Sequence, residues 1–325
     1  MLSTVKMQAR RYAKQAMRYA RAAGIPGTVN AQAIFQDGSE QERRGFYEAS
    51  VQRNLAGYRE RVRLMEELNV PAADVEPIGL RLPDIPKDKG YMLVRPDHFP
   101  LLDEALAEAR GAFRMYRPGA SKREHDSLEG VPREDRSYNS AINRLAMHPE
   151  VLRVVSKYMG ALPLLYRINV LYSPNNETVE YSSQFYHLDP EDVIMCKIFI
   201  FVEDVDADTG PTTLLPADRS MTVRHAITYR KGRVPDEVIE RIGGAENLIE
   251  ATGPAGTMAF LDTCRCFHMG SRKASKPRYA IMIQYQTPYA ASFPMTGALG
   301  SLPVGQGAVP PEATLLQQYL LGLKR

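Results

Sequence analysis

Apolar residues recur every three to four positions in several stretches of the chain, which is the spacing of one buried helix face. In the longest stretch, the apolar residues between 39 and 69 predict one continuous amphipathic helix. Four prolines between 71 and 86 then mark a linker, because proline interrupts regular structure. The predicted helices are 39–69, 100–116, 149–159, 235–243 and a last one through Leu315, Tyr319 and Leu323.

From residue 162 onwards the pattern changes to short apolar segments separated by turn residues such as Asp208-Thr-Gly-Pro211. Many short strands without alternating helices favour an antiparallel barrel or jelly roll over a parallel sheet. We therefore predict a mainly β fold with α-helices, in which a jelly-roll (cupin-like) core carries packed helices and an N-terminal helical extension. The predicted strands are 90–95, 164–172, 184–187, 193–203, 212–215, 221–225, 257–261 and 278–286.

These elements divide the chain into three parts. We expect a helical N-terminal extension with its linker over 1–88, the jelly-roll domain over 89–290, and a C-terminal tail with a short helix over 291–325. The apolar face of the 39–69 helix must be buried against something, because exposed apolar stripes of that length are unfavourable. It can pack on the domain that follows or on a second copy of the chain, which would make a homo-oligomer through the N-terminal helices.

Charge is nearly balanced, with 41 Lys and Arg against 38 Asp and Glu, so nothing in the composition indicates a nucleic-acid partner. The N-terminus differs, because six basic residues precede Asp37, the first acidic one. This basic arm fits a solvated helix, a membrane-surface element or an organellar transit peptide.

No apolar run reaches the length of a transmembrane helix, and the N-terminus lacks the apolar core of a secretory signal. We therefore expect a cytoplasmic protein without integral membrane contact. The three cysteines, Cys196, Cys264 and Cys266, are an odd number in a long chain, which does not fit a disulfide framework. We expect them to be reduced, and not to form a zinc site.

The candidate chemistry begins with His187-Leu-Asp189. Side chains at i and i+2 of a strand project from the same face, so the imidazole and the carboxylate can share one metal ion. His268 follows 79 residues after Asp189, between two predicted strands, and a jelly roll can bring it alongside this pair. Two imidazoles and one carboxylate leave three positions open, which suits an Fe(II) ion that binds both a co-substrate and O2.

Arg278 stands at the start of an otherwise apolar strand, ten residues after His268. A guanidinium that faces a barrel interior needs an anionic partner, since burying an unpaired charge is unfavourable. The distal carboxylate of 2-oxoglutarate is one such partner, held by the forked geometry of arginine. The alternatives are an acid of the chain such as Asp262, or an orientation towards solvent.

Taken in order, several segments between 90 and 288 resemble the phytanoyl-CoA dioxygenase family of Fe(II)/2-oxoglutarate-dependent oxygenases. The segments are Gly90-Tyr-Met-Leu-Val94, Gln184-Phe-Tyr-His-Leu-Asp189, Thr209-Gly-Pro-Thr-Thr-Leu-Leu-Pro216, Gly256-Thr-Met-Ala-Phe-Leu-Asp262, His268 and Pro277-Arg278. The resemblance implies a double-stranded β-helix in which His187, Asp189 and His268 hold the iron and Arg278 anchors 2-oxoglutarate. It also implies that O2 is consumed, that a small-molecule substrate is hydroxylated, and that succinate and CO2 are released.

The chain departs from the family pattern at two places. Where family members often have a Gly-Ser-His run, this chain has Pro216-Ala-Asp-Arg-Ser220, and it has no Trp on the strand after the iron motif. By spacing, Phe199 takes the place of that Trp, and we name Phe199 and Thr213 as candidate pocket-lining residues. Related halogenases replace the ligand carboxylate by a small residue, so Asp189 implies hydroxylation.

Other residues have plainer interpretations. Lys197 lies on a predicted barrel strand and can meet either an acid or a substrate carboxylate. The polar stretches 118–137 and 219–250 are candidate lids. The remaining histidines, His98, His125, His148 and His225, stand in polar or helix-start contexts and are interpreted as structural or exposed.

Two other functions remain open at this point. A cupin-like barrel can bind a metal or a small ligand without any oxygen chemistry, and it then releases no succinate. A zinc or manganese cupin that isomerises or hydrolyses its substrate is the second alternative, and it has no need of Arg278 near the metal.

Overall fold

A computed structural model describes residues 34–35, 37–69, 81–97, 99–116, 128–132, 137–174, 182–270, 272–290 and 313–324. The basic N-terminal arm, most of the candidate lid 118–137, most of the predicted C-terminal tail 291–325, His98 and His125 lie outside the described residues. Within the described part of the chain, the helices are too short or too polar to cross a membrane.

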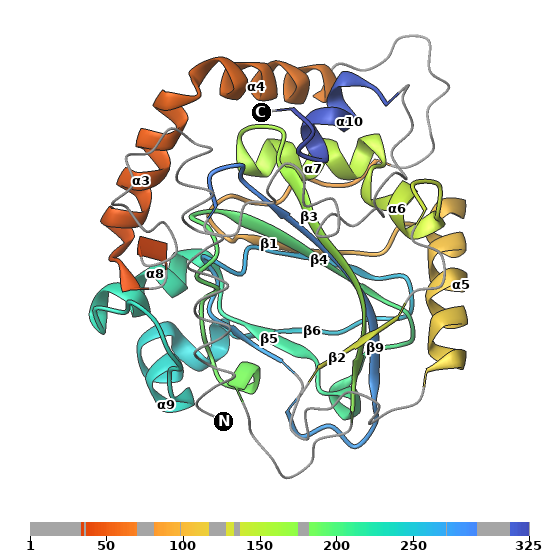
Figure 1. Cartoon of the computed structure of the whole chain (residues 1–325). Coiled ribbons are helices and arrows are strands. Elements are labelled where there is room, and N and C mark those ends of the chain that lie inside the picture. Colours follow the sequence, from red (N-terminus) through yellow and green to blue (C-terminus); the bar gives the residue numbers. More distant parts are fainter. Residues whose placement is uncertain are drawn as a thin grey trace, which may run out of the picture.

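Two antiparallel sheets form the centre of the molecule. The large sheet has the strand order β1-β7-β4-β9-β3-β2, and the small sheet has the order β6-β5-β8. Figure 1 shows β5 and β6 lying across from the large sheet. The strands of the large sheet are β1 (Tyr91–Val94), β2 (Glu129–Val131), β3 (Leu164–Ser173), β4 (Met195–Phe201), β7 (Met258–Leu261) and β9 (Arg278–Gln286). Those of the small sheet are β5 (Thr212–Leu214), β6 (Ile249–Ala251) and β8 (His268–Met269).

Alternation along the strands gives the large sheet two different faces. Ile198, Ile200, Ile281 and Ile283 point outwards into the main hydrophobic core, which the helices cover. Phe199 points to the other face and packs with Leu214 and Leu261 between the two sheets. The fold is therefore the predicted jelly roll of the double-stranded β-helix type, with helices packed outside the large sheet.

The helices on the outer face begin and end where local signals place them. Helix α7 (Pro149–Met159) begins with proline in its first turn and ends at Gly160, whose φ is +83°. Together with α5 (Pro100–Met115) and α6 (Ala141–Ala146) it contributes to the core against the large sheet. Its bounds, like those of β9, agree with the prediction from spacing.

The predicted helix over 39–69 is wrong in one respect, because it is two helices. Helix α3 (Glu40–Arg53) begins at a capping box between Ser39 and Glu42 and ends at Asn54, where φ is −120° and ψ is 45°. Helix α4 (Leu55–Asn69) then continues in a new direction (Figure 1). Leu64 of α4 packs with Leu162 and Tyr319, so its apolar face is buried on the chain itself.

The predicted strand 221–225 is also wrong, since these residues belong to helix α8 (Ala217–Ala226). Thr222 and Val223 favour strands locally, but the buried residues Ala217, Ser220 and Val223 recur at helical spacing. The 219–250 stretch continues through α9 (Asp236–Ile239) and the π-helical turn Glu240–Gly244. Both pack on a second hydrophobic cluster, outside the small sheet, that contains Leu215, Val234 and Ile239.

The remaining differences concern short elements. The predicted strand 184–187 is a 3₁₀ turn (Ser182–Gln184) followed by two isolated bridge residues, Tyr186 and His187. The strands β2, β6 and β8 and the helix α6 were not predicted, because two to six residues carry too little periodicity. The last helix, α10, is Leu315–Leu320.

Candidate metal centre

Three metal-competent side chains meet between the two sheets. One ligand atom from each of His187, Asp189 and His268 lies within 4.8 Å of the other two. Asp189 Oδ1 is 3.7 Å from His187 Nε2, and Asp189 Oδ2 is 3.8 Å from His268 Nε2. All three side chains are buried, so a cation that binds them would lie in the interior of the protein.

Strand pairing brings the two histidines together across 81 positions of sequence. Leu214 of β5 pairs with His268 of β8, and His268 forms an antiparallel bridge with His187. Both backbone hydrogen bonds of that bridge are present, at 3.0 and 3.1 Å. Directly opposed residues in an antiparallel pair point to the same face, so both imidazoles face the interior.

Backbone carbonyls orient the two rings. His187 Nδ1 is 2.8 Å from the carbonyl oxygen of Phe185, and His268 Nδ1 is 3.0 Å from that of Cys266. A carbonyl only accepts, so each Nδ1 carries the proton and donates it. The unprotonated Nε2 of each ring is therefore the one that faces Asp189, as in metal-binding histidines whose second nitrogen is held by a carbonyl.

The protonation states suit a divalent cation. Burial, followed by the neighbouring His268, lowers the pKa of His187 to about 3. Burial also lowers the pKa of His268. Burial opposes ionisation of Asp189, but the positive charge of Lys197 holds its pKa below the ordinary range, with further contributions from His268 and His187. At neutral pH the cluster offers two neutral imidazoles and one carboxylate.

Lys197 meets an acid, Asp189 itself. Its Nζ lies 2.6 Å from Asp189 Oδ2, and both side chains are largely buried. Lys197 reaches the interior because it alternates with Ile198, which points into the outer core. One carboxylate oxygen of Asp189 is thus held by an ammonium group, and the other remains available to a cation.

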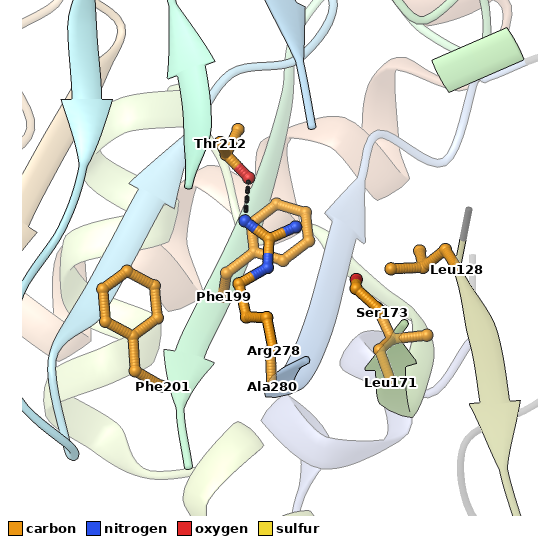
Figure 2. Close-up of a pocket in the computed structure, with 8 residues that line it drawn as sticks. All are labelled: Leu128, Leu171, Ser173, Phe199, Phe201, Thr212, Arg278 and Ala280. Atoms are coloured by element: carbon orange, nitrogen blue, oxygen red, sulfur yellow. Dashed lines mark hydrogen bonds between the residues drawn. The ribbon is translucent and has the colours of Figure 1, made fainter. Parts of the chain in front are cut away.

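Arg278 lies in a pocket next to this cluster. Figure 2 shows its guanidinium beside the ring of Phe199, with Thr212 and Ser173 on either side. The side chain is only 9% exposed and donates a hydrogen bond from Nη1 to Thr212 Oγ1 at 3.1 Å. Burial lowers its pKa to about 10, so it stays charged at neutral pH. The pocket is lined by Leu128, Leu171, Ser173, Phe199, Phe201, Thr212, Arg278 and Ala280.

No carboxylate in the described part of the chain lies within 4.0 Å of the Arg278 guanidinium. The proposed alternative partner, Asp262, is engaged elsewhere, because it accepts a hydrogen bond from the hydroxyl of Tyr158 at 2.7 Å. Of the two alternatives to a bound anion, the structure therefore excludes Asp262, and burial excludes a solvent-directed side chain.

Gly270 connects the pocket to the metal-binding cluster. A Cβ at this position would lie 3.5 Å from Arg278 Nη2 and 3.7 Å from Thr212 Oγ1. Gly270 is two residues after His268, so the guanidinium packs against the chain that carries one of the candidate ligands. The pocket and the cluster are neighbouring parts of one interior site.

Of the two candidate pocket residues, Phe199 lines the pocket and Thr213 does not. Thr213 pairs with Met269, which packs on the outer cluster, so Thr213 faces away from the interior. Its neighbour Thr212 occupies the inward position. Sequence reasoning missed Thr212 and Ser173, although Ser173 is the direct strand partner of Arg278.

The other residues considered from the sequence stay outside the site. Cys196, Cys264 and Cys266 are buried free thiols, and burial raises the pKa of each. His148 caps helix α7 through its ring nitrogen, and the side chain of His225 is 71% exposed. These positions agree with structural or surface roles.

Comparisons with known proteins give structural similarity alone. No family model and no curated protein matches the chain, so the resemblance to phytanoyl-CoA dioxygenases rests on the motifs. A similar solved structure is the non-heme alpha ketoglutarate dependent carbocyclase SnoK from nogalamycin biosynthesis, with 18% identity, coverage of 70% of this chain and 91% of that one, and a TM-score of 0.45.

Two further structures were solved with bound ligands. The epimerase SnoN, in complex with Fe3+, alpha ketoglutarate and nogalamycin RO, has 20% identity, covers 70% of this chain and 90% of its own, and has a TM-score of 0.42. The structure of EctD from S. alaskensis with 2-oxoglutarate and 5-hydroxyectoine has 17% identity, covers 72% of this chain and 79% of its own, and has a TM-score of 0.43.

Proposed function

We propose that the protein is an Fe(II)/2-oxoglutarate-dependent oxygenase that hydroxylates a small-molecule substrate. In this proposal His187, Asp189 and His268 hold the iron, and Arg278 binds the distal carboxylate of 2-oxoglutarate. The observation that carries it is a buried arginine without a carboxylate partner in the described structure, placed beside a buried cluster of two histidines and one aspartate.

The donor set fits iron. Two neutral imidazole nitrogens and a carboxylate form the two-histidine, one-carboxylate arrangement that leaves further positions open on a non-haem Fe(II) ion. A structural zinc site would normally complete four protein ligands, and the cluster found in the described residues has three.

The pocket fits 2-oxoglutarate. Its walls are mainly apolar, from Leu171, Phe199 and Ala280, and its one charged group is Arg278. A short dicarboxylate would place its methylene carbons against the apolar walls and its terminal carboxylate on the guanidinium, which can bind it through two parallel hydrogen bonds. Thr212 accepts a hydrogen bond from the same guanidinium and so fixes the direction of the fork.

When bound, iron and 2-oxoglutarate together would activate O2, with release of succinate and CO2. The chain's own residues hold and shape the site. The carbonyls of Phe185 and Cys266 keep both imidazoles in one tautomer, and Lys197 holds one oxygen of Asp189. Phe199 and Leu214 help to keep the space between the sheets apolar. Asp189, as a carboxylate ligand, favours hydroxylation as the outcome.

The test is to add Fe(II) anaerobically and titrate 2-oxoglutarate while recording the visible charge-transfer band of the chelate. We expect a saturable band in the wild type and none in His268→Ala. The Arg278→Ala variant should still form the band, but half-saturation should need at least about tenfold more 2-oxoglutarate, because a charge-assisted hydrogen bond to the co-substrate is lost. Arg219→Ala, at an exposed position of α8, is the matched control and should titrate like the wild type.

Two results would contradict the proposal. If a correctly folded wild-type protein shows no band, the barrel that binds a metal or ligand without oxygen chemistry becomes the better interpretation. If Arg278→Ala leaves the 2-oxoglutarate affinity unchanged, the anchor is assigned to the wrong residue.

A further inference from the structure

The small sheet continues past His187 by one more segment. Val234 forms an antiparallel bridge with Tyr186, and its amide donates to the Tyr186 carbonyl at 2.8 Å. Since His187 in turn bridges His268 of β8, the pairing runs from β5 and β8 through 186–187 to 233–234. Residues 233–234 belong to the 219–250 insertion, so this insertion contributes directly to the wall of the site.

The register of this pairing decides where Arg233 lies. Tyr186 and Val234 oppose each other and both pack in the outer cluster. The adjacent antiparallel positions, His187 and Arg233, therefore share the opposite face, which is the interior one. Arg233 stands next to His187 on the side away from His268.

The backbone around Arg233 is fixed to the strand of candidate ligands. The Tyr229 hydroxyl donates to the Gly232 carbonyl at 2.9 Å and accepts from the Leu188 amide at 3.3 Å. Gly232 has a φ of +102°, a conformation that favours glycine, so the turn that presents Arg233 depends on this residue. Leu188 lies between His187 and Asp189, so one hydroxyl ties this turn to the metal-binding motif.

The N-terminal extension holds the same turn from the other side. Arg43 of α3 donates to the carbonyl oxygen of Arg230 at 2.7 Å, and Lys231 pairs with Asp37. Arg43 is itself buried. The extension thus supports the segment that carries Arg233.

Two arginines therefore stand on different sides of the candidate metal centre. Arg278 is buried beside Thr212 and Gly270 and is assigned to 2-oxoglutarate by the proposed function. Arg233 is exposed and comes from the other end of the small sheet, where an incoming molecule can reach it. Lys197, whose Nζ lies 2.6 Å from Asp189 Oδ2, belongs to the metal-binding cluster itself.

We propose that Arg233 binds an anionic group of the substrate, a carboxylate or a phosphate, and that the enzyme therefore acts on an anionic small molecule. The inference rests on the proposed function, because it takes the metal centre and the role of Arg278 from it. A guanidinium suits both anions, since its planar fork matches two oxygen atoms at once. Arg233 is then a specificity-determining residue, and the cluster of candidate ligands lies between the proposed binding groups for co-substrate and substrate.

The test uses the full chain loaded with Mn(II), which is paramagnetic, together with saturating 2-oxoglutarate under anaerobic conditions. Binding of Mn(II) is first verified by electron paramagnetic resonance and binding of 2-oxoglutarate by its own proton relaxation. Inorganic phosphate and acetate are then titrated separately, and the metal-induced relaxation of the phosphate ³¹P and acetate methyl proton signals is measured. The variants are Arg233→Gln, Arg233→Lys and, as a matched control, Arg241→Gln at an exposed position of the same insertion.

We expect at least one of the two anions to show a saturable enhancement in the wild type and in Arg241→Gln. Arg233→Gln should weaken that binding at least about tenfold, and Arg233→Lys should be intermediate, because lysine keeps the charge without the fork. The anion that binds more tightly distinguishes a phosphate-bearing from a carboxylate-bearing substrate. If neither anion depends on Arg233 while Mn(II) and 2-oxoglutarate bind, the inference is overturned. If the wild type binds no Mn(II) or no 2-oxoglutarate, the proposed function fails and the inference fails with it.

Discussion

At the scale of single residues, burial of a charge does not by itself identify a functional group. Arg61 and Arg278 are both buried, and neither has a carboxylate partner in the described structure. The Arg61 guanidinium, however, donates to four backbone carbonyls, whereas Arg278 makes one hydrogen bond, to Thr212. A guanidinium has five N–H donors, so Arg278 retains most of its capacity for a ligand. Unused hydrogen-bonding capacity therefore separates Arg278, the proposed binding residue, from Arg61, which has a structural role.

Asp262 allows a prediction about pH. Burial raises its pKa to about 6, against the lowering effect of the Tyr158 hydroxyl. A carboxyl whose pKa is higher in the folded than in the unfolded state stabilises the fold most at low pH. That contribution is lost as pH rises from about 4 through about 6. The resulting decrease in the free energy of unfolding is on the order of 3 kcal/mol.

Asp262→Asn should remove this pH dependence, because the amide does not ionise and can still accept from the Cys264 amide. Urea unfolding of both proteins across this pH range measures the effect. The free energy of unfolding of the wild type should fall relative to the variant as pH rises. A constant difference between the two proteins at every pH would show that Asp262 does not titrate in this range.

At the scale of elements, strand alternation decides which of two identical neighbours belongs to the site. Thr212 and Thr213 are adjacent on β5, yet Thr212 contacts Arg278 and Thr213 shares its face with Met269. The same rule places Phe199 inside and Ile198 in the outer core. Even in β5, a strand of three residues, the inward and outward positions can be assigned once the strand's pairing partner is known.

The two threonines form a matched pair for an experiment. Thr212→Val removes the hydroxyl that accepts from Arg278, so we expect 2-oxoglutarate binding to weaken about two- to tenfold. Thr213→Val makes the same chemical change on the other face and should leave that affinity unchanged. Titration of the anaerobic chelate band with 2-oxoglutarate measures both. Equal effects of the two substitutions would contradict the assignment of the strand faces.

At the scale of the whole molecule, Arg61 joins helix α4 and the C-terminal helix α10 to the core. Arg61 of α4 donates to the carbonyls of Leu162 and Tyr319, at 3.0 Å each, and lies over the Tyr319 ring. Figure 1 shows α4, α7 and α10 gathered at this end of the molecule. At the opposite end of the extension, Arg43 supports the turn before Arg233. Helices α3 and α4 therefore contact both the C-terminal helix α10 and the turn before Arg233.

Arg61→Met should destabilise the fold by about 2–4 kcal/mol, because the carbonyls that Arg61 satisfies would be left buried without donors. Arg63→Met is the control, since Arg63 is exposed and pairs only with Glu60 and Glu67. Its effect should stay below about 1 kcal/mol. Urea denaturation of both variants measures the difference. A loss for Arg61→Met no larger than the control's would show that this junction contributes little.

The sequence by itself determined the elements whose signals are local. The bounds of α7 and β9 follow from apolar spacing, proline and glycine, and the two-sheet fold class follows from many short strands. The order of His187, Asp189, His268 and Arg278 along the chain was also sufficient to nominate one interior site. Such features are readable because spacing and backbone preference act within a few residues.

Only the tertiary structure decided the break at Asn54, the helical state of α8, the inward position of Thr212 and the pairing of Val234 with Tyr186. Each of these depends on a partner far away in the sequence. Thr222 and Val223 favour a strand until packing imposes a helix, and the facing of a short strand is unknown until its register is set. Long-range pairing carries this information, because a shift of one residue reverses every side chain between interior and exterior.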